Sequence, residues 1–244
     1  MRLLLPYVSL VCILISCGGD SDSQPECGLD VAFNGYNYAT VEIGDQCWFA
    51  ENLRTTQYAN GDEIFSELND EEWAGMFEGA TTVYAEDNVT IYNGRADAAA
   101  NLADYGRLYN WWAVADERGI CPSGWHVPSD EEFKNLEITL GMSLGQADSL
   151  FERGTDQGKR LKSSSTDDPA WNGTNTEGFN GLPAGGRIGG DFTGFTGEGQ
   201  SQYFWTSSIE YATSAWKRDL FEGDGIRRGG GDRHQGYSCR CIRD

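Results

Sequence analysis

Residues 121–133 read CPSGWHVPSDEEF, and this stretch contains the clearest local fold signal in the chain. Ser129 is followed three residues later by Glu132, which is the pattern of a capping box at the amino end of a helix. Asp130 and Glu131 then lie at the positive end of the helix dipole, where acidic side chains are favourable. The apolar residues that follow share one helical face up to a stop at Gly141: Phe133, Leu136 and Leu140. The stretch therefore predicts a strand, a tight turn and a capped helix.

A second helix is predicted just before this stretch. The apolar residues of segment 108–115 recur at the spacing of one helical face: Leu108, Trp111, Trp112 and Ala115. Gly119 and Pro122 end the pattern. Residues 59–101 are polar and acidic and have no long periodic run, so we expect loops and short elements there.

Short strands are predicted towards both ends of the chain. Apolar residues alternate around the turn pairs Asn34-Gly35 and Gly44-Asp45, which predicts paired strands. From Gly178 onward, short apolar clusters alternate with glycines, a pattern typical of antiparallel strands. We therefore expect one α+β domain over residues 27–244, with two helices packed on short, antiparallel, glycine-rich strands.

The first residues have the composition of an export signal. Arg2 precedes the apolar stretch Leu3–Ile15, which would span about 20 Å as a helix, too little for a bilayer core of about 30 Å. Residues 14–17, LISC, resemble the lipobox of bacterial lipoproteins, in which a thiol follows the cleavage site. Residues 1–16 are therefore predicted to be a signal peptide, and Cys17 the lipidated residue that anchors the protein in the membrane. The alternative is an ordinary signal in which Cys17 occupies that place by chance.

The residues after Cys17 predict a tether and an exported location. Residues 17–26 are small, polar and acidic, so they cannot bury apolar surface and should form a flexible linker. Acidic residues in this place resemble the surface-export signals of some Gram-negative lipoproteins. We therefore expect an outer-membrane lipoprotein that is exposed at the cell surface.

Charge and cysteine content restrict the partners and the chemistry. The net charge is −20 at pH 7, so a nucleic-acid partner is not expected, because phosphates would be repelled. The acidity is compatible with solubility, with cations such as Ca²⁺ and with basic partners.

After loss of Cys12 and lipidation of Cys17, five of the seven cysteines remain. In an oxidising compartment this odd number predicts two disulfides and one unpaired thiol. Cys239 and Cys241 are two residues apart on one strand face, so each should find a separate partner or stay free.

Several motifs, in one order, resemble the Fibrobacter succinogenes major paralogous domain, a family of exported bacterial modules. They cover about residues 27–244 and are VEIGDQCWFAENL (41–53), YGRLYNW (105–111), CPSGWHVP (121–128), GF (178–179), LPAGG (182–186), WTSS (205–208) and GYSCRCIRD (236–244). The resemblance implies a fold similar to C-type lectin-like domains. It also implies that Cys121 pairs with Cys241 and Cys27 with Cys47. Cys239 stands where the family usually has valine, so it should be a small unpaired core residue, although a swapped Cys121–Cys239 bridge stays open.

No catalytic, cofactor or metal site is predicted. The only histidines are His126, for which a structural role is expected, and His234, which is expected in an exposed loop. Asp232 and His234 with Cys239 and Cys241 could imitate a zinc site, but no second Cys or His pair completes it. The lectin-like fold is shared with formylglycine-generating enzymes, but Cys239 and Cys241 lie at the chain end, so that activity is not carried over.

Binding is the function class that the sequence favours. Trp171, Trp205 and Trp216 offer flat apolar faces of the kind that stack on sugar rings, with core packing as the alternative for each. Candidate hydroxyl-binding neighbours are Asn172, Asn175 and Thr206. The Glu-Pro-Asn and Gln-Pro-Asp triplets of calcium-dependent lectins are absent. We expect a non-enzymatic, surface-anchored module that binds an extracellular glycan, fibre or protein. The alternatives are an assembly component of the outer envelope and an enzyme of the formylglycine-generating type.

Overall fold

A computed structural model describes residues 26–86, 89–189 and 194–244. The predicted signal peptide, Cys17 and all but the last residue of the predicted tether lie outside these ranges. The described helices are α1 (Asp70–Ala74), α2 (Ala98–Tyr105), α3 (Trp111–Ala115), α4 (Asp130–Thr139), α5 (Leu144–Asp148) and α6 (Gln157–Leu161). The described strands are β1 (Val31–Phe33), β2 (Tyr36–Tyr38), β3 (Thr40–Ile43), β4 (Gln46–Phe49), β5 (Thr81–Thr82), β6 (Leu108–Tyr109), β7 (Trp125–His126), β8 (Phe151–Arg153), β9 (Ala184–Ile188), β10 (Gly194–Glu198), β11 (Gln202–Tyr211), β12 (Ser214–Leu220), β13 (Ile226–Asp232) and β14 (Ile242–Arg243).

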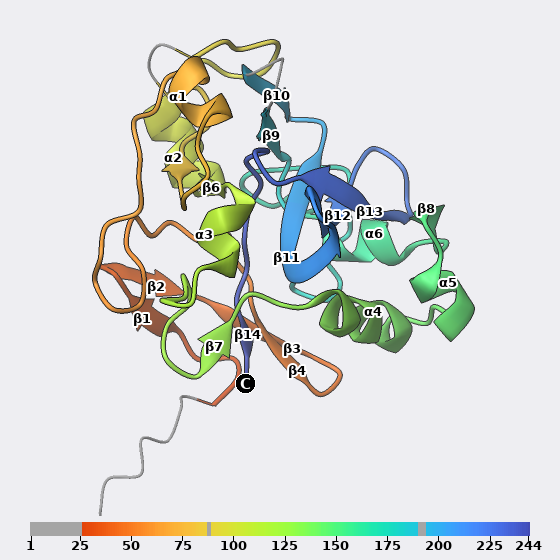
Figure 1. Ribbon diagram of the computed structural model, residues 1–244. Helices are drawn as coiled ribbons and strands as arrows, with labels where there is room; N and C mark the ends of the chain where they lie inside the picture. Colours follow the sequence, from red (N-terminus) through yellow and green to blue (C-terminus); the bar gives the residue numbers. More distant parts are fainter. Residues whose placement is uncertain (1–25, 87–88, 190–193) are drawn as a thin grey trace, which may run out of the picture.

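Two sheets form the body of the molecule (Figure 1). The larger has the order β10-β9-β11-β12-β13-β8 and is antiparallel except between β9 and β11. The smaller has the order β3-β4-β14-β7. Ile242 of its strand β14 pairs with both Trp48 and His126, so the end of the chain lies between an early strand and the middle of the chain.

The core lies on both faces of the smaller sheet. Neighbouring side chains on a strand point to opposite faces, and in β4 Trp48 and Phe49 belong to different hydrophobic clusters. Trp48 packs on Phe133 of α4, with ring centroids 5.1 Å apart, in the cluster that reaches the larger sheet. Phe49 packs on Trp125 of β7 at 4.7 Å, in the cluster that contains the disulfide-bonded Cys121. Helix α4 and the smaller sheet are therefore fixed against the rest of the domain by large aromatic side chains.

The capped helix predicted from residues 129–141 is confirmed. Ser129 Oγ accepts a hydrogen bond from the Glu132 backbone N–H at 3.2 Å, and Glu132 Oε2 accepts one from the Ser129 N–H at 2.7 Å. The hairpins around Asn34-Gly35 and Gly44-Asp45 are also confirmed, as β1–β2 and β3–β4.

The α+β class is confirmed, but the expectation of two helices is wrong: the described residues hold six helices and fourteen strands. Segment 59–101 was expected to hold loops and short elements; the short helix α1 lies inside it, and α2 begins at its end and continues to Tyr105. Leu108 was placed on one helix with Trp111, yet it belongs to β6. The reason is Asn110, whose side chain accepts a hydrogen bond from the Ala113 N–H at 3.1 Å and so caps α3 at its true start.

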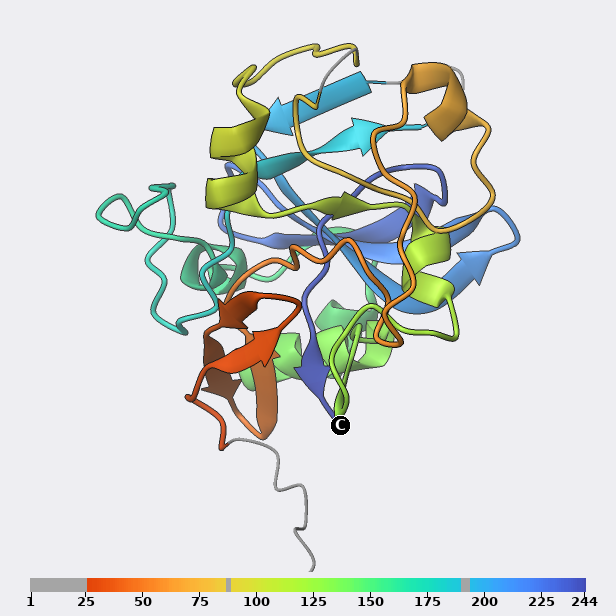
Figure 2. The ribbon, with the colours of Figure 1, turned by 90° about the vertical axis from the view of Figure 1, so that its left-hand side faces the viewer.

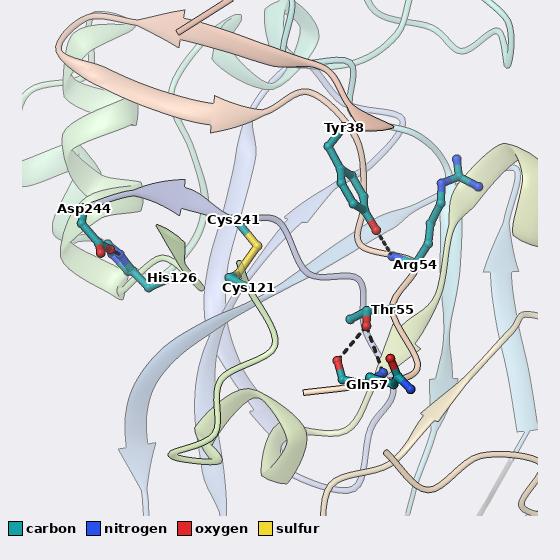
Figure 3. The surroundings of a disulfide bond; sticks show 8 residues. All are labelled: Tyr38, Arg54, Thr55, Gln57, Cys121, His126, Cys241 and Asp244. Carbon is teal, nitrogen blue, oxygen red and sulfur yellow. Dashed lines mark hydrogen bonds and ion pairs between the residues drawn. A yellow bond between two sulfur atoms is a disulfide. The ribbon is translucent and has the colours of Figure 1, made fainter. Parts of the chain in front are cut away.

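Two disulfides, Cys27–Cys47 and Cys121–Cys241, staple the domain, and they are the pairs that the family resemblance implies. The first spans 20 residues and the second 120. In Figure 3 the second bridge joins the segment before β7 to the segment before β14. Cys239 is a free thiol with no exposed surface, and burial holds its pKa well above the usual value. No helix in the described ranges is long and apolar enough to cross a membrane.

Candidate binding site

An open hollow of about 520 Å³ lies between the loop that follows α6 and the ends of the larger sheet. We name it the Trp171 hollow, and its lining residues are Trp171, Asn172, Gly199, Gln200, Ser201, Phe221, Glu222 and Arg227. Positive φ angles at Gly197 (80°) and Gly199 (78°) shape the tight β10–β11 turn that supplies one wall. Its volume is within the range of about 300–1,000 Å³ typical of small-molecule sites.

The wall formed by residues 221–223 is held from inside the protein. The carbonyl oxygens of Phe221 and Gly223 accept hydrogen bonds from the Lys162 ammonium at 2.7 and 2.9 Å. The Glu222 carbonyl between them accepts one from the Asn172 amide at 2.8 Å. Three successive carbonyls are thus occupied, so the wall has a fixed shape.

Lys162 lies beneath Trp171 and has no exposed surface. Its ammonium is 5.0 Å from the centroid of the Trp171 ring, which is within cation–π range. Burial lowers the pKa of Lys162 to about 8. Trp171 itself is half-buried, so the indole is supported from below and still lines the hollow.

Polar groups around the hollow remain available for a ligand. Within the described residues, the side chains of Gln200, Ser201 and Glu222 make no hydrogen bond or ion pair. Arg227 stacks over the Phe221 ring at 3.7 Å and approaches Glu152 only to 3.8 Å. An aromatic face beside an amide, a hydroxyl and a carboxylate suits a ligand that combines apolar ring faces with many hydroxyl groups.

A second hollow, of about 540 Å³, lies on the other side of the same loop. We name it the Tyr36 hollow; its lining includes Tyr36, Glu51, Arg54, Asp104, Asp168 and Asn180. Figure 2 shows the loop around residues 164–180 (teal) projecting beside α2 and the N-terminal strands. The other walls come from α2, from Tyr36 of β2 and from the segment that follows β4. Asp104 pairs with Arg95 at 2.7 Å. Asp168 has no hydrogen bond or ion pair in the described part of the chain, and the buried Asn180 Oδ1 has no partner.

Trp205, one of the three predicted ligand-binding residues, is packed in the core, which was the alternative expected for each tryptophan. It has no exposed surface, its Nε1–H donates to the Tyr109 carbonyl at 2.8 Å, and its ring lies 4.6 Å from that of Tyr237. Thr206, predicted to bind hydroxyls, is also fully buried, and its hydroxyl donates to the Trp216 carbonyl at 2.9 Å. Both residues lie on β11 in the middle of the larger sheet, where the segments that contain Tyr109, Trp111 and Tyr237 contact them.

The three predicted tryptophans do not form one platform. Trp205 pairs in register with Lys217, so the next residue, Trp216, points to the opposite face of the sheet. Trp216 is half-buried, and the Arg228 guanidinium lies 3.8 Å from its ring centroid. Of the three, Trp171 alone lines either hollow. The predicted polar partners are divided as well, with Asn172 in the Trp171 hollow and Asn175 in the Tyr36 hollow.

The most charged group of side chains in the interior is structural. We name it the buried ion cluster, and its members are Asp130, Glu137, Arg153, Arg218 and Arg228. Arg218 contacts Glu137 and Asp130, each at 2.7 Å, and Arg228 contacts Asp130 at 2.7 Å. Burial would raise the pKa of Asp130, but hydrogen bonds from Arg228 and Arg218 outweigh it and hold the pKa below its usual value. Because each carboxylate is held by arginines and covered, the cluster joins α4 to β8, β12 and β13 and presents no reactive group to either hollow.

His126 is held between two carboxylates. Its Nε2 lies 2.8 Å from Glu132 and its Nδ1 lies 2.6 Å from the side chain of the last residue, Asp244 (Figure 3). The hydrogen bond with Glu132, opposed by burial and helped by Asp244, raises the pKa of His126 to about 9. Burial would raise the pKa of Glu132, but bonds from His126 and Ser129 lower it to about 2.

We name this group, His126 with Glu132 and Asp244, the carboxylate clamp, and it predicts a defined pH dependence of stability. A histidine with a raised folded-state pKa stabilises fully below its ordinary value of 6.5 and loses that contribution as the pH rises through about 9. Glu132 loses its contribution as the pH falls from 4.5 through about 2, so the clamp acts best between about pH 4.5 and 6.5. The His126→Gln variant should lose at most about 1 kcal/mol, because the ring is partly exposed to solvent. Melting temperatures measured from pH 4 to 10 check this, and parallel curves for variant and wild type would contradict it.

His234 was expected in an exposed loop, but it is half-buried, and it completes no metal site within the described residues. Its Nδ1 is 3.0 Å from Asp232, and its ring packs on Trp112 at 4.5 Å. Cys241 is in a disulfide, and within the described ranges no three metal-binding side chains gather.

A comparison with protein-family models identifies the family. The model of the Fibrobacter succinogenes major domain matches residues 41–243. The chain belongs to this family. A search of the curated proteins finds no match to the chain.

The motifs that carry the resemblance build the scaffold of this major domain. The stretch CPSGWHVP supplies Cys121 of the second disulfide and His126 of the carboxylate clamp. The terminal GYSCRCIRD supplies Cys241 and β14. None of the motif residues quoted above lines the Trp171 hollow. The quoted motifs therefore build the frame, and the walls of the hollow come from other segments within the matched region.

Several residues of the site were missed from the sequence. Gln200, Ser201 and Glu222 lie in turns more than 25 residues from Trp171 and follow no pattern that links them to it. Lys162 follows Leu161 at the end of α6 and gives no local sign of burial. Gly197 and Gly199 separate two of the apolar clusters from which antiparallel strands were predicted, and this is the local signal for this wall.

Proposed function

We propose that this major domain is a non-enzymatic binding module, held at the cell surface by a lipid on Cys17, and that the Trp171 hollow binds an extracellular glycan. The observation that carries the proposal is the combination of a half-buried indole with unpaired amide, hydroxyl and carboxylate groups in one open hollow. Such a combination stacks on sugar rings and hydrogen-bonds their hydroxyls. The lectin-like fold implied by the family resemblance agrees with this role and stays a prediction.

A binding role is favoured over catalysis because the groups that could act as acid, base or nucleophile are paired or buried. His126 has carboxylates on both ring nitrogens, and the carboxylates of the buried ion cluster are held by arginines. The free thiol of Cys239 is buried and its raised pKa disfavours the nucleophilic thiolate. The unpaired groups that remain, in the two hollows, can recognise a ligand without reacting with it.

Replacing Trp171 by alanine should weaken glycan binding at least tenfold. A tryptophan at the centre of an interface typically contributes more than 1.4 kcal/mol, which corresponds to that factor. A polysaccharide array identifies the bound glycan, and calorimetry then compares the variant with wild type. Tyr211→Ala is the matched control, because Tyr211 is 71% exposed on the distant β11–β12 hairpin. An array without binding, or equal affinity of Trp171→Ala and wild type, would overturn the proposal. Copurification with outer-membrane proteins in that case would favour the envelope-assembly role.

The lipid anchor makes a separate prediction. The Cys17→Ala variant should move from the membrane fraction to the soluble fraction, because multiple acyl chains hold a protein firmly on a bilayer. Cys239→Ala is the control, since that buried thiol cannot accept lipid in the folded domain. Fractionation and labelling with radioactive palmitate check the result, and label that survives in Cys17→Ala would refute the anchor.

A further inference from the structure

One short piece of chain separates the two hollows. Asp168 and Pro169 line the Tyr36 hollow, and Trp171 and Asn172 line the Trp171 hollow. Only Ala170, which is exposed, lies between them. Because each residue extends the chain by at most about 3.6 Å, the Cα atoms of Pro169 and Trp171 are no more than about 7 Å apart. The two hollows are therefore separated along the chain by one small residue, and we name the segment of residues 168–172 the crest.

The crest is rigidly held. The Asp167 carboxylate accepts hydrogen bonds from the Ser164 N–H at 2.7 Å and from the Asn175 amide at 3.1 Å. The Trp171 N–H donates to the Ser164 carbonyl at 3.1 Å. A side chain at Gly173 would lie 2.2 Å from the Lys162 carbonyl, so the base of the loop is packed directly on the buried strand-like segment below. A ligand lying over this loop would not have to order it, which favours affinity.

The Tyr36 hollow contains the same kinds of group as its neighbour. The Arg54 guanidinium lies 4.5 Å from the Tyr36 ring centroid, so the ring is supported on one side, as Trp171 is by Lys162. The exposed Asp168 carboxylate, which is unpaired within the described residues, offers hydrogen-bond acceptors. An aromatic ring with nearby acceptors repeats, across the crest, the chemistry of the Trp171 hollow.

Charge restricts the ligand that could lie in both hollows. The carboxylates of the Tyr36 hollow outnumber its one arginine: Glu51, Asp104, Asp167 and Asp168 against Arg54. Uronic acids and sulfated sugars would be repelled there. An uncharged sugar chain keeps its hydroxyl donors for these acceptors and meets no such repulsion.

We propose that the two hollows are consecutive subsites of one site, which takes an uncharged linear polysaccharide laid across Ala170. The inference rests on the proposed function and extends it from a glycan to a polymeric glycan bound along its length. A ligand that fills both subsites should bind more tightly than one that fills either, because the second contact is made without a new association cost.

The test compares the affinities of short and long oligosaccharides and introduces a bulky side chain at the crest. The probes are the dimers and hexamers of cellulose, xylan, mannan and chitin oligosaccharides, titrated by calorimetry. For a series that binds, the hexamer should bind at least tenfold more tightly than the dimer. Ala170→Trp should abolish that gain and leave dimer affinity unchanged, because the bulky side chain blocks the crest and neither hollow. Ala212→Trp is the control, since Ala212 is an exposed alanine at the far tip of the β11–β12 hairpin.

A second variant protects the test against a folding defect. Asp168→Ala removes an exposed side chain of the Tyr36 hollow and should reduce hexamer affinity by a larger factor than dimer affinity, because a dimer can occupy the Trp171 hollow alone. Equal affinity for hexamer and dimer, or a length gain that survives Ala170→Trp, would overturn the inference and leave the proposed function intact. Absence of binding by every dimer and hexamer would overturn the proposed function itself.

Discussion

Replacing Cys241 by serine is expected to lower the free energy of unfolding by about 4–5 kcal/mol under oxidising conditions. The Cys121–Cys241 bridge closes a loop of 120 residues, and a loop of that length restricts the unfolded chain by about this amount. Both cysteines are buried in the cluster around Phe49 and Trp125, so the loss also leaves unpaired polar groups in an apolar core. Denaturant unfolding followed by tryptophan fluorescence measures the change.

Two other cysteine variants serve as comparisons for this result. Cys47→Ser breaks a bridge that closes only 20 residues and should cost about 3 kcal/mol. Cys239→Ala leaves both bridges in place and should cost less than Cys241→Ser. If Cys241→Ser unfolded like wild type while Cys239→Ala lost the large stabilisation, the swapped Cys121–Cys239 bridge would be the correct one.

Replacing Glu137 by leucine is expected to destabilise the domain by about 3–5 kcal/mol. Glu137 is 1% exposed and holds Arg153 and Arg218, so its removal leaves the buried Arg153 without a carboxylate and the buried Arg218 with Asp130 alone. Breaking a buried ion pair in this way typically costs that much. Burial already lowers the pKa of Arg153 to about 10 with Glu137 present, which reflects the cost of keeping this charge in the interior.

The control for this prediction is on the same helix. Glu131→Gln changes a carboxylate whose side chain is 66% exposed in α4 and should alter the unfolding free energy by about 0.5 kcal/mol or less. Adding Arg153→Met to Glu137→Leu should recover part of the loss, because one uncompensated charge is removed. A Glu137→Leu variant as stable as Glu131→Gln would show that the buried ion cluster does not hold α4 on the larger sheet.

The parts of the fold that could be predicted are those fixed by neighbouring residues. Ser129 and Glu132 cap α4 through bonds within four residues, and Asn34-Gly35 turns β1 into β2 directly. The lengths of the helices could not be predicted from neighbouring residues alone, because the start of α3 is set by the cap at Asn110 and the helix is held by packing on β11. A periodic apolar pattern alone does not show where such a short helix begins.

The candidate site could be predicted only in part, because it is assembled from distant segments. Trp171 and Asn172 were recognised as an aromatic residue with a polar neighbour, and both line the Trp171 hollow. Trp205 has the same local chemistry, but packing against the distant residues Tyr109 and Tyr237 buries it, and its sequence neighbours do not indicate that packing. Lys162 and the buried ion cluster depend on contacts between residues as far apart as 130 and 228, so no local pattern indicates them.

The central claim is that the Trp171 hollow receives the ligand, and the indole N–H signals of the eight tryptophans test it most directly. In a heteronuclear NMR titration with the oligosaccharide hexamers named above, the Trp171 signal should shift and saturate. The signals of Trp48 and Trp205, which have no exposed surface, should stay in place. Binding detected by calorimetry while the Trp171 signal did not move, and another indole signal did, would contradict the claim.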